Sequence, residues 1–151
     1  MMSLNTIDID NVLKRNNITK KDFIGVFPSC EIPKSEMKRY FFITNSDTHD
    51  EPGSHWTAWM VENDKVEFFD SFGRSPANYQ MPHYYKHYVL GKRVSYSSLR
   101  VQSFSSKTCG YFCVFYVYLR SLGFDYEFIV SELRNLDNND EIVVEFYRTL
   151  Q

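Results

Sequence analysis

The sequence predicts one α+β domain, with a central mixed sheet of about five strands flanked by helices. Two observations predict this class. Short runs of aromatic and β-branched residues, which favour strands, fill the middle of the chain, and apolar residues at helical spacing fill its two ends. The length of 151 residues suits a single domain with one sizeable core, so residues 1–151 are expected to fold together.

The first half of the chain is expected to begin with helices and to continue as strands. A helix should cover 6–15 and stop at two asparagines, and a brief helical segment over 19–25 should close at Gly25. An ordered loop that contains two prolines follows. Three strands come next, and a hairpin turn joins the last two. Their expected ranges are 39–45, 55–61 and 65–70.

The second half is expected to return from strands to helices. Its central feature is an apolar helix over 110–122, which is hydrophobic on nearly every face and should therefore be buried. The other expected elements are a helical segment from Ser75 that carries Tyr84, Tyr85 and Tyr88, a strand over 93–97 with room for a second short strand before 102, and helices over 126–135 and 139–150 with N-caps at Asp125 and Asp137.

Charge, hydropathy and cysteine content exclude several classes of protein. The net charge is −2 and basic residues do not cluster, which argues against nonspecific binding to nucleic acid. Apolar runs stay well below the roughly 20 residues of a membrane span, and the first residues do not resemble a secretory signal. Three cysteines cannot all pair within one chain. A reducing, intracellular setting is therefore expected, with free thiols.

One of these thiols, Cys109, lies where a loop gives way to the apolar helix. The N-terminus of a helix stabilises a thiolate, which is the reactive form of cysteine. Taken alone, Cys109 is more readily explained as a small buried residue, the common fate of a free cysteine. Cys113 lies one turn further along and should point into the interior. A structural role is expected for Cys113 and for Cys30, without a bridge between Cys109 and Cys113.

Three upstream residues supply partners for a cysteine nucleophile. His55 begins a predicted strand and could exchange a proton with the thiol, and Asp70 ends the neighbouring strand and could orient the imidazole. The amide of Gln102 could stabilise an oxyanion beside the backbone N–H of Cys109. Each residue alone also fits an ordinary loop or turn role. The order His, Asp, Gln, Cys is the stronger signal and indicates a cysteine peptidase.

Other histidines compete with His55 for the role of base. They are His49, His83 and His87. The last two share a predicted helix face at a spacing suited to metal binding. No nearby cysteine or carboxylate completes a tetrahedral zinc site, so neither a metal nor another cofactor is predicted.

Three motifs give the chain a resemblance to a known family. They are Gly-Ser-His-Trp-Thr-Ala-Trp over 53–59, Phe-Phe-Asp-Ser-Phe-Gly over 68–73 and the segment 101–113. Together they resemble the adenain (adenovirus protease) family over about 40–122, and more distantly the SUMO-specific proteases. The segment 25–33 is most similar to adenain-like proteases of Maverick/Polinton elements and virophages, which often carry aspartate where this chain has Cys30.

The resemblance implies a role for each matching position. Adenovirus adenain has glutamate at the position of the orienting acid, where this chain has aspartate. A tryptophan beside the catalytic histidine would wall a narrow cleft, which explains why the family cleaves at Gly-Gly or Gly-X sites. The implied roles are general base for His55, orienting acid for Asp70, nucleophile for Cys109, oxyanion-hole amide for Gln102, and substrate binding for Trp56 and Gly110.

The expected function is therefore that of a cysteine endopeptidase that processes viral capsid or core precursors during virion maturation. The expected partners are those precursor polypeptides, and the expected location is the virion and the host cell interior, in cytoplasm or nucleus. We expect a monomer without DNA or membrane binding, and the need for an activating peptide is left open. Two alternatives are a deconjugase for ubiquitin-like modifiers with the same fold and a noncatalytic binding module that retains the groove.

Overall fold

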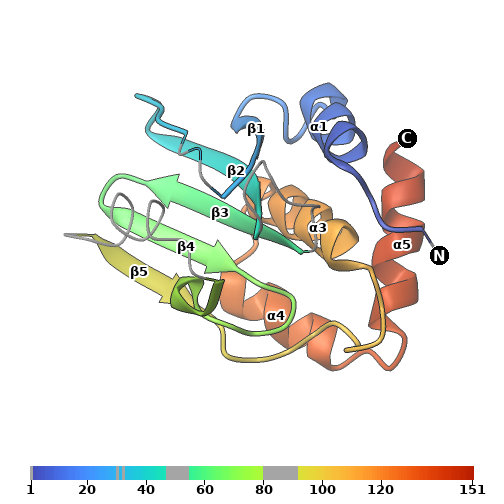
Figure 1. The fold of residues 1–151 in the computed structure, drawn as a ribbon. Helices are drawn as coiled ribbons and strands as arrows, with labels where there is room; N and C mark the ends of the chain where they lie inside the picture. The colour runs from blue at the N-terminus through green and yellow to red at the C-terminus, as the bar shows by residue number, and fades with distance from the viewer. Residues whose placement is uncertain (1, 30, 32, 47–54, 80–91) are drawn as a thin grey trace.

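The computed structural model of the chain describes residues 2–29, 31, 33–46, 55–79 and 92–151. Within these residues, five strands form one sheet in which the spatial order follows the order in the chain (Figure 1). The three central strands are antiparallel, and each outer strand runs parallel to its neighbour. The predicted mixed sheet is thus present. The strands are β1 (Phe23–Phe27), β2 (Arg39–Asn45), β3 (Trp56–Glu62), β4 (Lys65–Phe69) and β5 (Arg93–Tyr96).

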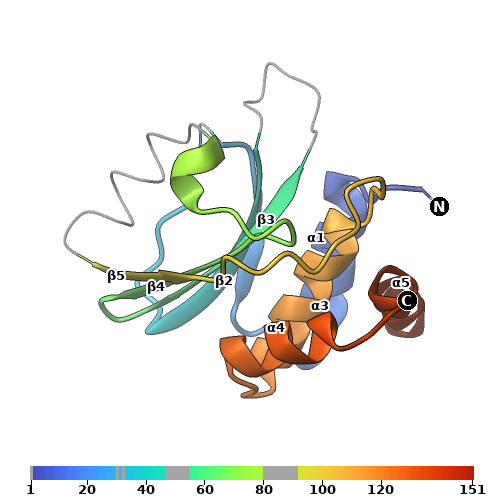
Figure 2. The ribbon, with the colours of Figure 1, turned by 90° about the horizontal axis from the view of Figure 1, so that it is seen from below.

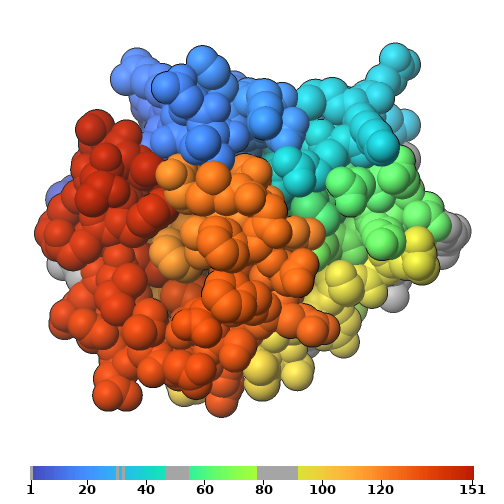
Figure 3. Space-filling model, turned by 180° about the vertical axis from the view of Figure 1, so that it is seen from behind, coloured from blue at the N-terminus to red at the C-terminus, as the bar shows by residue number. Residues whose placement is uncertain are grey.

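The described α-helices pack on one face of this sheet, as the rotated view in Figure 2 shows. The helix that begins at Cys109 lies against the sheet. The C-terminal helix packs on the side of this helix that faces away from the sheet (Figures 1 and 2). Seen from behind, the α-helices form one continuous helical face (Figure 3). These helices are α1 (Thr6–Arg15), α3 (Cys109–Ser121), α4 (Tyr126–Arg134) and α5 (Asn139–Leu150).

The sheet has a hydrophobic core on each face. The larger core joins the sheet to the helices and includes Ala58 and Met60, whereas Trp59 and Val61 belong to a smaller core on the opposite face. Successive side chains of a strand point to opposite faces. Because both faces are covered, nearly every residue of β3 is buried, which explains the unbroken apolar and aromatic character of this segment.

The structure corrects the predicted helical segment over 19–25. The loop after α1 is held by Asn16, whose Oδ1 accepts hydrogen bonds from the backbone N–H groups of Ile18 and Thr19. The chain then enters β1, which pairs in parallel with β2. Gly25 lies within β1 at a register shift, with φ of +142°, and does not end a helix. Pairing with β2 therefore decides the conformation of this segment.

Most other elements agree with prediction to within one or two residues at each end. The predicted second short strand before 102 is absent from the described residues, and the N-cap of α5 is Asn138 in place of Asp137. The helical segment from Ser75 is a short 3₁₀ helix, Pro76–Tyr79, and its predicted continuation through Tyr84, Tyr85 and Tyr88 lies outside the described residues. Among the described helices, none is both long and apolar enough to cross a membrane.

Candidate active site

Two neighbouring strands bring His55 and Asp70 together. His55 directly precedes β3 and Asp70 directly follows β4, and these strands are antiparallel, so both residues lie at the same end of the sheet. The Nε2 atom of His55 lies 2.6 Å from Oδ1 of Asp70, and both side chains are buried. A short hydrogen bond to a buried carboxylate fixes the orientation of the imidazole ring.

The carboxylate of Asp70 is itself held by the turn that follows it. Its Oδ1 accepts a hydrogen bond from the backbone N–H of Phe72 at 3.0 Å, and its Oδ2 accepts one from Arg74 at 3.0 Å. Gly73 makes this turn possible. It has φ of +74°, and a Cβ there would lie 2.7 Å from the backbone carbon of Leu99. The motif Asp-Ser-Phe-Gly is therefore a rigid support for the acid.

Cys109 is the first residue of α3 and faces the end of β3. Its Sγ accepts a hydrogen bond from the backbone N–H of Trp56 at 3.5 Å, and the thiol also bonds to the ring of His55. Since Nε2 of His55 is engaged by Asp70, exchange of a proton with Cys109 falls to Nδ1. The structure thus brings together three of the predicted site residues in the order Cys109, His55, Asp70.

This arrangement favours a positively charged imidazole. Burial lowers the pKa of His55, but hydrogen bonds to Asp70 and Cys109, together with the charges of both groups, outweigh burial and raise this pKa from 6.5 to about 9. His55 is therefore protonated at neutral pH. An imidazolium next to a cysteine favours the thiolate, which is the nucleophilic form.

The Gln102 side chain is held by hydrogen bonds to two residues, one next to Asp70 and one in the loop that leads to Cys109. The hydroxyl of Ser71, the residue after Asp70, donates to Oε1 of Gln102 at 2.5 Å. The Nε2 atom of Gln102 donates to the backbone carbonyl and the hydroxyl of Ser106, each at 3.1 Å. The backbone N–H of Gln102 also bonds to the carbonyl of Ser71. The side chain is buried, and its amide has a defined orientation.

The two predicted substrate-binding residues lie against each other beneath the N-terminal segment. The indole N–H of Trp56 donates to the backbone carbonyl of Leu4 at 3.0 Å, so Trp56 is almost completely buried. Gly110 packs so closely that a Cβ would lie 3.2 Å from both Leu4 and Trp56. Their role in substrate binding remains a prediction, but Gly110 also meets a packing requirement.

The second cysteine of the helix has a different environment. Cys113 is fully buried in the core between sheet and helices, and burial raises the pKa of its thiol well above the usual range. Both Cys109 and Cys113 are free thiols. Cys113 therefore packs in the core, as predicted. The third cysteine and the rival histidines lie outside the described residues; they are Cys30, His49, His83 and His87.

Sequence reasoning did not single out several residues that contact the site. Phe72 stacks on the ring of His55 at 4.8 Å between centroids, and Phe104, which is exposed, stacks on Phe72. The guanidinium of Arg100 lies 4.0 Å above the ring of Phe104. The sequence could have indicated the contact of Phe72 with the site, because Phe72 follows Asp70 by two residues and the turn that holds this acid also places the ring.

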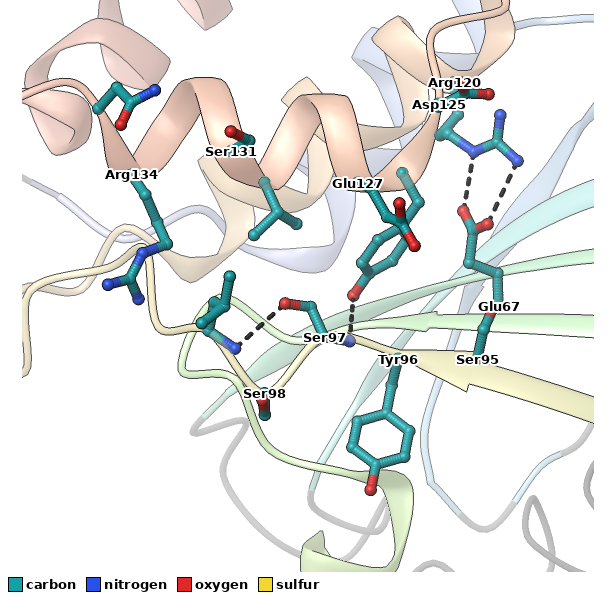
Figure 4. Close-up of a pocket in the computed structure, with 14 residues that line it drawn as sticks. Glu67, Ser95, Tyr96, Ser97, Ser98, Arg120, Asp125, Glu127, Ser131 and Arg134 are labelled. Atoms are coloured by element: carbon teal, nitrogen blue, oxygen red, sulfur yellow. Dashed lines mark hydrogen bonds and ion pairs between the residues drawn. The ribbon is translucent and has the colours of Figure 1, made fainter.

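A separate groove of about 740 Å³ lies between α4 and the segment that follows β5 (Figure 4). It contains the ion pair between Glu67 and Arg120, and the hydroxyl of Tyr126 accepts a hydrogen bond from the backbone N–H of Ser97 at 3.1 Å. The residues that line it do not include the predicted catalytic residues. The groove is thus distinct from the Cys109 site.

Comparison with known proteins supports the fold. No protein-family model matches the sequence, and no curated protein sequence matches it. Among solved structures, the pS273R protease of ASFV aligns with a TM-score of 0.63 and 20% identity, over 98% of this chain and 67% of that chain. The central domain of an uncharacterized protein, Lpg1148 of Legionella pneumophila, aligns with a TM-score of 0.61 and 14% identity over the whole of both chains.

A further match is the SUMO protease Ulp1 with its catalytic cysteine oxidized to a sulfinic acid. It aligns with a TM-score of 0.53 and 15% identity, over 99% of this chain and 80% of that chain. The chain has the fold of SUMO-protease-like cysteine peptidases. This confirms the predicted fold class, a mixed sheet of five strands in the described residues with helices packed on it.

Proposed function

We propose that the protein is a cysteine endopeptidase that cleaves viral capsid or core precursors at glycine-containing sites during virion maturation. The observation that carries the proposal is the contact of Cys109 with His55, whose Nε2 lies 2.6 Å from Asp70. The likeness in fold to a protease of ASFV and to a SUMO protease supports peptide-bond chemistry at this site. Roles for His55, Asp70, Cys109 and Gln102 follow from the proposal.

The proposed acylation step uses the protonated imidazole. The Cys109 thiolate attacks the scissile carbonyl carbon, a C–S bond forms, and the carbonyl electron pair moves onto oxygen. Gln102 would stabilise this oxyanion together with the N–H of Cys109, by turning toward it one of the two amide hydrogens that it directs at Ser106. The C–N bond then breaks, and His55 gives its proton to the leaving amine.

The deacylation step regenerates the enzyme. The now neutral His55 takes a proton from water as the oxygen attacks the thioester carbonyl. The C–S bond breaks, the carboxyl product leaves, and the thiolate faces the imidazolium again. Asp70 keeps its proton-free form throughout and stabilises the charge on His55.

Co-expression with candidate capsid precursors tests the proposal. We expect the wild type to process the precursor and Cys109→Ala to leave it intact, because Cys109 supplies the thiol that is hydrogen-bonded to His55. Cys113→Ala is the matched control, since it removes a thiol from the same helix without touching the proposed machinery. Equal processing by wild type and Cys109→Ala would reject the assignment.

A deconjugase for ubiquitin-like modifiers is the second candidate. The observation that favours it is the likeness to the SUMO protease Ulp1 over 99% of this chain. The mechanism and the preference for glycine before the cleaved bond would be shared, so the catalytic residues do not separate the two candidates. Fluorogenic substrates that end in the C-termini of ubiquitin-like proteins do. Rapid turnover of these, with no cleavage of capsid precursors, would favour the deconjugase.

The remaining expectations about partners belong to the same proposal. The proposed enzyme acts as a monomer in the virion and host cell, without DNA, in keeping with the net charge of −2. Adding DNA, or peptides from the precursor, to the cleavage assay shows whether either one is an activator. A rise in kcat with peptide alone would identify a peptide activator.

A further inference from the structure

The first turn of α5 holds the loop that leads to Cys109. The amide of Asn139 donates to the backbone carbonyl of Val101, at the start of this loop. The carboxylate of Asp140 accepts hydrogen bonds from the backbone N–H of Ser103 at 3.2 Å and from the hydroxyls of Ser106, at 2.7 Å, and Thr108. These contacts span more than thirty residues of sequence and cover the loop from end to end.

Ser106 connects Asp140 to the Gln102 amide through hydrogen bonds. The Ser106 hydroxyl has a single hydrogen, and two groups that can only accept lie within hydrogen-bond distance of it, the Asp140 carboxylate at 2.7 Å and the backbone carbonyl of Ser103 at 2.9 Å. The Ser106 oxygen is then left to accept a hydrogen bond from Nε2 of Gln102. At the other end of the amide, Ser71 donates to Oε1 of Gln102. The NH₂ group of Gln102 is therefore held at Ser106, three residues before Cys109.

We propose that Asp140 is a positioning residue that orients the Gln102 amide for oxyanion stabilisation. The inference rests on the proposed peptidase function and adds a residue that acts through Ser106 and Gln102. With asparagine at 140, the side chain can donate to Ser106, and its NH₂ group can face the N–H of Ser103. Ser106 then loses a fixed partner, so its carbonyl and hydroxyl can shift, and the Gln102 amide that they hold can shift with them.

The test separates oxyanion stabilisation from the reactivity of the thiol. Alkylation of Cys109 by iodoacetamide needs the thiolate but no oxyanion hole, whereas peptide hydrolysis needs both. The variants are Asp140→Asn and Asp140→Ala, with Glu141→Gln as the control, because Glu141 lies in the same helical turn, is exposed and carries the same charge. Each is assayed for kcat, KM and the rate of Cys109 alkylation.

We expect kcat to fall about tenfold in Asp140→Asn and up to about a hundredfold in Asp140→Ala, the range for a displaced oxyanion donor. The value of KM and the alkylation rate should stay close to those of the wild type, as should every value for Glu141→Gln. Unchanged kcat in both Asp140 variants would overturn the proposal. A parallel fall in alkylation and hydrolysis would also overturn it, because that pattern indicates general loss of structure.

Hydrogen exchange keeps this inference separate from the proposed function. If the wild type hydrolyses none of the substrates, the proposed function fails, and the role of Asp140 is then judged by amide exchange over 102–108. Faster exchange in this segment of Asp140→Asn, with unchanged exchange in β3 and β4, supports positioning of the loop. Exchange equal to that of the wild type across 102–108 rejects it.

Discussion

Cys109 and Cys113 lie one helical turn apart in α3 and are both buried free thiols, yet their polar surroundings differ. Cys109 contacts the His55 ring and the N–H of Trp56 at the end of the sheet. Cys113 lies in the core, where burial raises the pKa of its thiol well above the usual range. Position on the helix therefore divides the two thiols, because it places Cys109 beside the His55 ring and packs Cys113 in the core.

Selective alkylation checks this division. In folded protein under reducing conditions, iodoacetamide should modify Cys109 and leave Cys113 unmodified, because a buried thiol with a raised pKa forms little thiolate. Mass spectrometry of the tryptic peptides measures the extent at each site. In concentrated urea both should react. Equal modification of the two cysteines in the native protein would contradict the account.

Asp70 should control the pH range of activity. The hydrogen bond and charge of Asp70 raise the pKa of His55 against the opposing effect of burial, to about 9. The alkaline limb of kcat/KM, where His55 loses the proton needed by the leaving amine, is thus expected near pH 9 in the wild type. In Asp70→Asn this limb should move to lower pH and the rate should fall at least about tenfold. An unmoved limb in the pH–rate profile would exclude this role.

The sequence singled out the residues that meet in the candidate site better than those that support them. His55, Asp70 and Cys109 were found because their types and order are typical of one mechanism, and the structure brings their side chains together. Asp140 was not found, because its contacts with Ser106 and Thr108 arise only when α5 folds back onto the loop. Spacing along the chain carries no signal for such a contact.

At the scale of elements, α3 is joined to the sheet by a buried polar cluster as well as by apolar packing. Glu67 of β4 accepts hydrogen bonds from Arg120 at 2.8 Å and from the hydroxyl of Tyr116 at 2.5 Å. Burial and the charge of Glu67 raise the pKa of Tyr116 well above the usual range, which keeps the hydroxyl a donor. This cluster fixes α3, and with it Cys109, relative to the strands that carry His55 and Asp70.

Removing one partner of this cluster should lower the free energy of unfolding. Arg120→Met keeps the apolar stem but leaves the Glu67 charge buried without its cation, and we expect a loss of about 3 kcal/mol in the free energy of unfolding. Arg93→Met is the control, since its ion pair with Asp64 is exposed and should contribute nothing measurable. Urea denaturation measures both. Similar stabilities for the two variants would show that the cluster does not hold α3.

The element that sequence reasoning assigned wrongly shows where local patterns fail. The segment Phe23–Phe27 follows a helix and a turn, and Gly25 resembles a helix end. Its conformation is decided by pairing with β2, which comes twelve residues later and cannot be read from local spacing. In contrast, α1 and β2 were predicted correctly because their own periodicity and composition match their burial.

For the whole molecule, the two cores of the sheet bear on the expectation of a single domain. Trp56 lies in the core shared with the helices, and Trp59, three residues along β3, lies in the core on the other face. Because one strand contributes to both cores, they should lose their structure together.

A single cooperative unfolding transition is therefore expected. Tryptophan fluorescence reports on both faces of β3, and far-ultraviolet circular dichroism is dominated by the helices. The two signals should give the same midpoint and the same slope in urea. Two separated transitions would show that the sheet and the helices unfold as independent units and would contradict the single domain.

The central claim is that Cys109 is a nucleophile activated by His55. A peptide vinyl sulfone that ends in Gly-Gly forms a stable thioether with such a nucleophile, and mass spectrometry of the intact and digested protein locates the adduct. We expect one adduct, on Cys109, in the wild type and in Cys113→Ala, and very slow labelling in folded His55→Ala. An adduct on another cysteine, or equal labelling of the wild type and His55→Ala, would contradict the account.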